Sequence, residues 1–136
     1  MMTIRRVSAI LYAIISGVVV AFQIALAAGA PWGEYAMGGA FPGQFPPALR
    51  IAALIQATLL VGMAIIVLAR AGLLALWSRA ARWLIWGVVG FSALSFVLNL
   101  ITPSAGERAI WAPIAFLLLI SSAMVAFTNS SAHPAQ

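Results

Sequence analysis

The sequence predicts an all-α membrane protein, a single bundle of four transmembrane helices with a long loop between the first two. Of its 136 residues, 65% are hydrophobic and only 7% are charged, and the mean hydropathy is +1.12. Soluble domains carry about 25% charged residues, so this composition excludes an ordinary soluble fold. Four apolar segments each approach the ~20 residues that a helix needs to cross the hydrocarbon core. They are residues 7–28, 49–69, 83–102 and 109–128.

The first segment, residues 7–28, has a small residue at every fourth position: Ala9, Ala13, Gly17, Ala21 and Ala25. Such rows let two helix backbones approach closely in lipid, where association depends on van der Waals contact. We expect a packing face here, against another helix of the chain or against a second copy in a homo-oligomer. Alanine is frequent in this sequence, so a chance row is the alternative. The length of the apolar run favours a retained helix over a cleaved signal peptide, whose core spans ~7–15 residues.

Three amide side chains interrupt the apolar segments: Gln23, Gln56 and Asn99. At a rise of ~1.5 Å per residue, all three fall in the half of the bundle nearest the first connection. Ser92, Ser95 and Asn99 share one face of the third helix. Two interpretations stay open, because buried amides serve either as hydrogen bonds between helices or as the lining of a polar pocket open to the outer face.

The connection between the first two helices, residues 29–47, is rich in glycine, proline and aromatic residues and has one charge, Glu34. Glycine and proline disfavour helix and strand, and so few charges are not typical of a solvated linker. We expect it to fold back on the bundle, with Trp32 among its aromatics at the level of the lipid headgroups. A passive aromatic anchor is the alternative to a functional lid.

The second outer connection, residues 103–108, delivers Glu107 and Arg108 to the start of the fourth helix. A carboxylate in a first helical turn is stabilised by the helix dipole, which is the simplest role for Glu107. The alternative is ion pairing across the mouth of the bundle, Glu34 with Arg108 or Arg50 with Glu107. The predicted ligand-binding residues are therefore Gln23, Trp32, Glu34, Arg50, Gln56, Asn99, Glu107 and Arg108.

The seven basic residues are all arginine, and five lie on one side of the predicted bundle: Arg5, Arg6, Arg70, Arg79 and Arg82. Positive charge concentrates on the cytoplasmic side of membrane proteins, so both termini are expected in the cytoplasm of a multi-pass protein of the cell membrane. The formal charge of +5 then suits anionic lipid headgroups. We expect membrane lipids, and not nucleic acid, as partners.

Several short motifs carry a resemblance to a known family. They are Ala30-Pro31-Trp32-Gly33-Glu34, Gly38-Gly39, Pro42-Gly43 and Pro46-Pro47-Ala48-Leu49-Arg50, followed by Asn99 and by Glu107-Arg108 with Trp111 and Pro113. Together these motifs span most of the chain and resemble a family of small uncharacterised bacterial four-helix integral membrane proteins. The resemblance implies the same fold and carries no activity.

The residues for enzyme chemistry are missing, since there is no cysteine and the one histidine, His133, lies in a polar tail. We expect no catalytic residues, cofactor or metal site. The preferred interpretation is a noncatalytic protein that binds a lipid-like or small amphipathic ligand, or a partner helix, in an outer-leaflet pocket lined by the amides. The alternative is a small oligomeric transporter that uses Glu34, since the helix interiors offer no other acid for proton coupling.

Overall fold

The computed structural model describes residues 3–128 and confirms the all-α fold. Its four long helices are α1 (Ile4–Ala27), α2 (Pro47–Arg70), α3 (Ser78–Ile101) and α4 (Ala105–Phe127). Each is long and apolar enough to cross a membrane. The chain is therefore a multi-pass membrane protein, and His133 lies outside the described residues.

All four helices begin earlier than the apolar pattern predicted, and polar side chains cap the first turns of α1 and α4. The Thr3 hydroxyl accepts a hydrogen bond from the Arg6 N–H, so Arg5 and Arg6 belong to the first turn of α1 and do not precede it. Ser104 caps α4 in the same way through the Glu107 N–H, at 3.2 Å. Such caps satisfy backbone donors that a helix leaves free. Hydropathy detects the lipid-crossing part of a helix, whereas caps decide its first residue.

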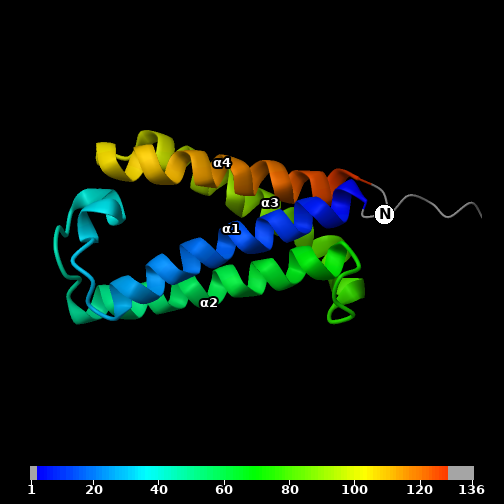
Figure 1. The fold of residues 1–136 in the computed structure, drawn as a ribbon, viewed down its shortest axis with the longest axis horizontal. Coiled ribbons are helices and arrows are strands. Elements are labelled where there is room, and N and C mark those ends of the chain that lie inside the picture. The colour runs from blue at the N-terminus through cyan, green and yellow to red at the C-terminus, as the bar shows by residue number, and fades with distance from the viewer. Residues whose placement is uncertain (1–2, 129–136) are drawn as a thin grey trace, which may run out of the picture.

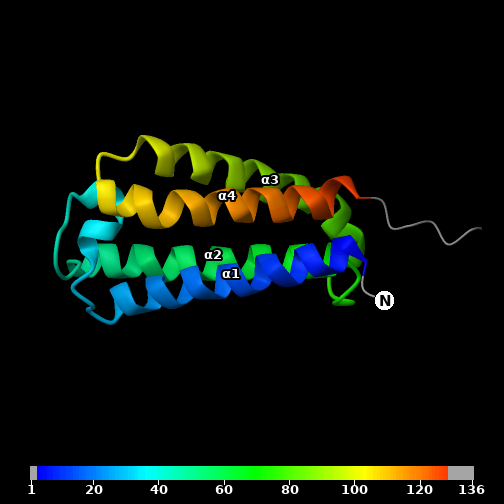
Figure 2. The same cartoon turned by 45° about the horizontal axis from the view of Figure 1, so that its top comes forward.

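The helices form two antiparallel hairpins, α1 with α2 and α3 with α4, and α1 also packs on α4. The hairpins lie close together at the end that carries the N-terminus and diverge towards the other end, which we call the loop end (Figures 1 and 2). The main core fills the N-terminal end and includes Tyr12, Val67, Ile85 and Val125. Only a small cluster of Leu26, Phe45 and Ala53 occupies the loop end. The interior at the loop end is thus less completely filled.

The connection between α1 and α2 folds back over the loop end, as expected (Figure 1). It is more ordered than its composition indicated, because it contains two 3₁₀ turns, η1 (Gly33–Tyr35) and η2 (Met37–Gly39). Gly33 is buried, and its N–H donates to the Gly43 carbonyl at 2.9 Å, which joins two parts of the connection. A β-carbon at Gly33 would overlap the carbonyl oxygens of Phe41 and Gly43. The fold of the connection therefore requires glycine at this position.

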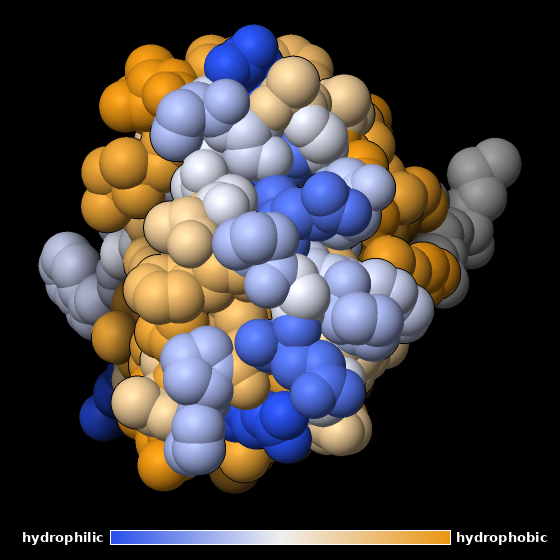
Figure 3. All heavy atoms as spheres, turned by 90° about the vertical axis from the view of Figure 1, so that its left-hand side faces the viewer, coloured by the Kyte–Doolittle hydropathy of each residue, from blue (hydrophilic) through white to orange (hydrophobic). Residues whose placement is uncertain are grey.

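The charged residues separate between the two ends of the bundle. The five arginines singled out above lie at the N-terminal end, and Glu34 and Glu107 lie at the loop end. Arg5 is buried, and its guanidinium donates to the backbone carbonyl of Thr128, which is the C-cap residue of α4. A cation at this position complements the negative end of the helix dipole. Seen from the loop end, the polar residues form a band bordered by hydrophobic side chains (Figure 3).

The small residues of the α1 row change from buried to exposed along the helix. Ala9 is fully buried, whereas Gly17 and Ala21 are exposed. A β-carbon placed on Gly17 would meet nothing within 4 Å. The middle of the row thus faces open space in the part of the chain that the structure describes, and contact with a second copy stays a prediction.

Candidate functional site

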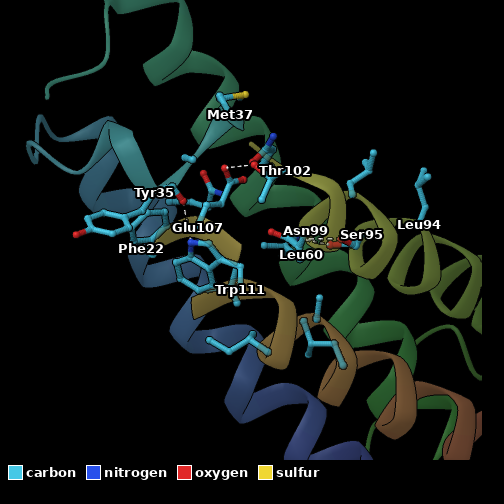
Figure 4. Close-up of a pocket in the computed structure, with 18 of the residues that line it drawn as sticks. Phe22, Tyr35, Met37, Leu60, Leu94, Ser95, Asn99, Thr102, Glu107 and Trp111 are labelled. Carbon is cyan, nitrogen blue, oxygen red and sulfur yellow. Dashed lines mark hydrogen bonds between the residues drawn. The ribbon is translucent and has the colours of Figure 1, made fainter. Parts of the chain in front are cut away.

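A cavity of about 710 Å³ occupies the loop end of the bundle, between the diverging hairpins (Figure 4). All four helices and the connection between α1 and α2 contribute side chains to it. Its size falls within the ~300–1,000 Å³ typical of small-molecule sites. Its polar lining residues are Tyr12, Gln23, Tyr35, Gln56, Ser92, Ser95, Asn99, Thr102 and Glu107, set among aliphatic and aromatic residues.

The structure places all three predicted amides in the lining of this one cavity: Gln23 from α1, Gln56 from α2 and Asn99 from α3. The Asn99 amide donates to the Ser95 carbonyl at 2.7 Å, one turn earlier in its own helix. This bond does not join two helices. Gln23 and Asn99 are half-buried, whereas Gln56 is exposed.

The segment 35–38 covers the cavity. Three hydrogen bonds fasten this segment and the preceding Glu34 to the start of α4. The Gly38 N–H donates to Oε2 of Glu107 at 2.9 Å, and the Ser104 hydroxyl donates to the Glu34 carbonyl at 2.9 Å. The indole N–H of Trp111 donates to the Tyr35 carbonyl at 2.8 Å. Backbone groups of an irregular segment need such partners near a membrane. We call these three hydrogen bonds the loop latch.

Glu107 is the centre of the loop latch. Besides Gly38, its Oε2 accepts the Thr102 hydroxyl at 2.8 Å, and its own N–H is capped by Ser104. Glu107 is half-buried and lines the cavity. Glu107 thus lies in the first turn of α4, as expected, and its side chain is also part of the cavity wall.

Aromatic rings surround the same end of the cavity. The ring centroids of Phe22 and Trp111 lie 4.6 Å apart, and the ring of Trp32 is nearly parallel to that of Phe22 with centroids 6.1 Å apart. Trp111 follows Glu107 by one helical turn, so the two share a face of α4. Figure 4 shows Trp111, Tyr35 and Glu107 together on one side of the cavity, with Asn99 opposite.

The inner end of the cavity is formed by Tyr12 and Ser92, both buried. Close by, one turn along α1 from Tyr12, lies Ser16, whose buried hydroxyl has no hydrogen-bond partner among residues 3–128. A few polar groups in an otherwise apolar wall are typical of sites for amphipathic molecules.

The opening of the cavity lies between α2 and α3. Several lining residues on these two helices are exposed, among them Leu59 at 54%, Leu94 at 56% and Leu98 at 53%. These side chains belong to apolar, membrane-spanning segments. The opening therefore lies on the side of the bundle, among residues of membrane-spanning segments, and the segment 35–38 covers the cavity at the loop end.

The structure separates four of the predicted ligand-binding residues from the cavity, because Trp32, Glu34, Arg50 and Arg108 are not among its lining residues. Glu34 is exposed. Arg50 donates to the Phe45 carbonyl at 2.8 Å, and Arg108 donates to the Thr102 carbonyl at 2.6 Å.

We expected ion pairs of Arg50 with Glu107 and of Glu34 with Arg108. In the part of the chain that the structure describes, both arginines bind backbone carbonyls instead. Both arginines lie within six residues of the carbonyl that they bind. Local acceptors are reached with little loss of side-chain entropy, so they replace distant carboxylates.

Sequence reasoning missed several lining residues, notably Tyr35, Gly38, Thr102 and Trp111. Thr102 and Trp111 flank Glu107 in the sequence, and a polar or aromatic residue beside an interfacial acid was the available signal. Tyr35 and Gly38 gave no such signal, because only the fold of the connection brings them over the cavity.

Comparisons of this chain with protein-family models, with curated proteins and with solved structures found no match. Across residues 3–128, no group of three or more histidine, cysteine, aspartate or glutamate side chains is arranged to hold a metal ion. The functional argument therefore depends on the cavity itself.

Proposed function

We propose that this protein is a noncatalytic membrane protein that binds a lipid-like or small amphipathic ligand in the cavity at its loop end. The observation that carries the proposal is that Gln23, Gln56 and Asn99, from three different helices, line one cavity of about 710 Å³ beneath the latched connection. Amides gathered only for helix packing would be expected to leave no space between them.

The sideways opening supports a ligand that arrives from the bilayer. Leu59, Leu94 and Leu98 offer an apolar passage at the opening, and the exposed Gln56 lies among the lining residues there. An amide facing hydrocarbon without a partner is costly. A ligand with a polar head would supply hydrogen bonds to this amide while its chain stays in contact with the leucines.

The orientation that suits this function has both termini in the cytoplasm and the cavity in the outer leaflet. It is supported by the positions of Arg5, Arg6, Arg70, Arg79 and Arg82 at the end opposite the loop latch, since arginine favours the cytoplasmic side. The same arginines suit anionic headgroups of the inner leaflet.

Transport through Glu34, the alternative from the sequence, gains no support from the geometry. The Glu34 side chain is exposed and lies outside the cavity lining. A proton-coupling carboxylate would have to face the substrate path. A partner helix in the opening would be longer than the cavity and is tested by the experiment below.

The experiment is native mass spectrometry of protein extracted in a mild detergent, which reports bound lipid and subunit number together. We expect a lipid-sized or smaller adduct on the wild type, and its loss from Ser95→Phe, which fills the cavity from α3. Gln56→Leu should weaken retention of the adduct, whereas Gln44→Leu should not, because Gln44 is an exposed amide outside the cavity.

An adduct that persists in Ser95→Phe at the wild-type level would contradict binding in the cavity. A wild type that carries a bound polypeptide and no small adduct would replace the proposal with docking of a partner helix.

A further inference from the structure

The lining of the cavity contains one charged side chain, Glu107, and its charge is negative. Arg50 and Arg108 lie at the same end of the bundle, but their guanidinium groups bind backbone carbonyls outside the cavity. An anionic head would meet a carboxylate at the wall and no cation to pair with, which is unfavourable in a partly desolvated site. The negative charge of the cavity wall thus favours a ligand whose head group is positively charged.

The hydrogen bonds that Glu107 accepts leave part of its carboxylate for a ligand. Both the Gly38 N–H and the Thr102 hydroxyl bind Oε2, so within residues 3–128 the acceptor capacity of Oε1 is uncommitted. The half-buried position of Glu107 strengthens an interaction with a cation relative to one at an exposed site. Two bonds on Oε2 also hold the carboxylate in a fixed orientation.

Aromatic rings next to Glu107 complete a site for a cation. Trp111 lies one helical turn from Glu107, and Tyr35, Phe22 and Phe45 line the same cavity. The face of an aromatic ring attracts ammonium groups, and rings gathered around a carboxylate recognise quaternary ammonium heads. The apolar side chains towards the opening then have the chemistry to contact an alkyl chain.

We propose that the cavity prefers amphiphiles with an ammonium or quaternary ammonium head, which binds at Glu107 and Trp111, with the alkyl chain directed to the opening between α2 and α3. This inference rests on the proposed function, because it names the class of ligand for the same cavity. It assigns the charged contact to Glu107 and not to Glu34.

The test compares decyltrimethylammonium with the neutral decyldimethylphosphine oxide and the anionic decyl sulfate. Each is added at low concentration to protein in neutral maltoside micelles, and binding is followed by saturable change in tryptophan fluorescence. Partitioning of each amphiphile into the micelles is the same for every variant. We expect the wild type to bind the cation about tenfold more tightly than the neutral amphiphile, with decyl sulfate the weakest.

Three variants locate the effect. Glu107→Gln should abolish the preference for the cation, whereas Glu34→Gln, which makes the same change in net charge at the same end of the bundle, should retain it. Thr102→Val removes one hydrogen bond of the Glu107 carboxylate but keeps its charge, and it should retain the preference as well.

Saturable binding of all three amphiphiles without a preference would overturn the inference and leave the proposed function intact. A preference that survives in Glu107→Gln, or that is lost in Thr102→Val as fully as in Glu107→Gln, would also overturn it. If none of the three amphiphiles binds saturably to the wild type, the proposed function fails and this inference fails with it.

Discussion

The carboxylate of Glu107 and the backbone N–H of Gly38 are 2.9 Å apart, although 69 positions separate them in the chain. This hydrogen bond joins the first turn of α4 to the segment that covers the cavity. With the bonds of Ser104 to Glu34 and of Trp111 to Tyr35, it holds residues 34–38 over the cavity. The following predictions test this relationship and the arrangement of the bundle around it.

Glu107→Ala should lower the free energy of unfolding by about 1–3 kcal/mol, because it leaves the Gly38 N–H and the Thr102 hydroxyl without their acceptor. Reversible denaturation in mixed micelles measures the change. Glu34→Ala is the matched control and should stay within about 0.5 kcal/mol, since the Glu34 side chain is exposed. Hydrogen exchange at Gly38 should become faster only in Glu107→Ala. Equal stability of the two variants would show that the loop latch does not stabilise the fold.

Gly33→Ala should disrupt the connection between α1 and α2, because the added β-carbon overlaps the carbonyl oxygens of Phe41 and Gly43. Overpacking of this kind costs about 1–3 kcal/mol. We expect faster hydrogen exchange in residues 33–43 with little change in the four helices. Gly87→Ala is the control, since a β-carbon at Gly87 meets nothing within 4 Å. Unchanged exchange in Gly33→Ala would mean that the connection has a different fold.

Single cysteines should report the orientation, because the sequence contains none. Gln44→Cys lies exposed at the loop end, and Ser78→Cys lies exposed at the arginine-rich end. A membrane-impermeant maleimide added to intact cells should label Gln44→Cys, and should label Ser78→Cys only after the membrane is opened. The positive-inside rule gives this expectation. The reverse labelling pattern would place the cavity in the inner leaflet.

Gly17→Cys should form a disulfide between two copies if the small-residue row of α1 is a contact between protomers. The exposed position of Gly17 and the empty space around it permit such an approach, and small residues favour it in lipid. Leu117→Cys, exposed near the middle of α4, is the control and should cross-link far less. Equal cross-linking at the two positions would indicate random collision.

The sequence by itself determined the fold class and the number of helices. Twenty-residue apolar segments in lipid have to be helical, because no other open structure satisfies their backbone groups. The placement of five arginines at the end opposite both glutamates followed from the same segments, since consecutive helices alternate in direction. For the same reason, Gln23, Gln56 and Asn99 could be placed in one half of the bundle.

Only the tertiary structure decided what those residues surround. The pairing of Arg50 with the Phe45 carbonyl, the position of Glu107 at the cavity wall and the exposed side chain of Glu34 depend on how residues 29–46 fold over the bundle. That fold depends on contacts between distant parts of the chain, such as Gly38 with Glu107. The hydropathy of a segment indicates whether it lies in lipid or in water. A cavity depends on the angle between the hairpins and on hydrogen bonds that no local sequence pattern encodes.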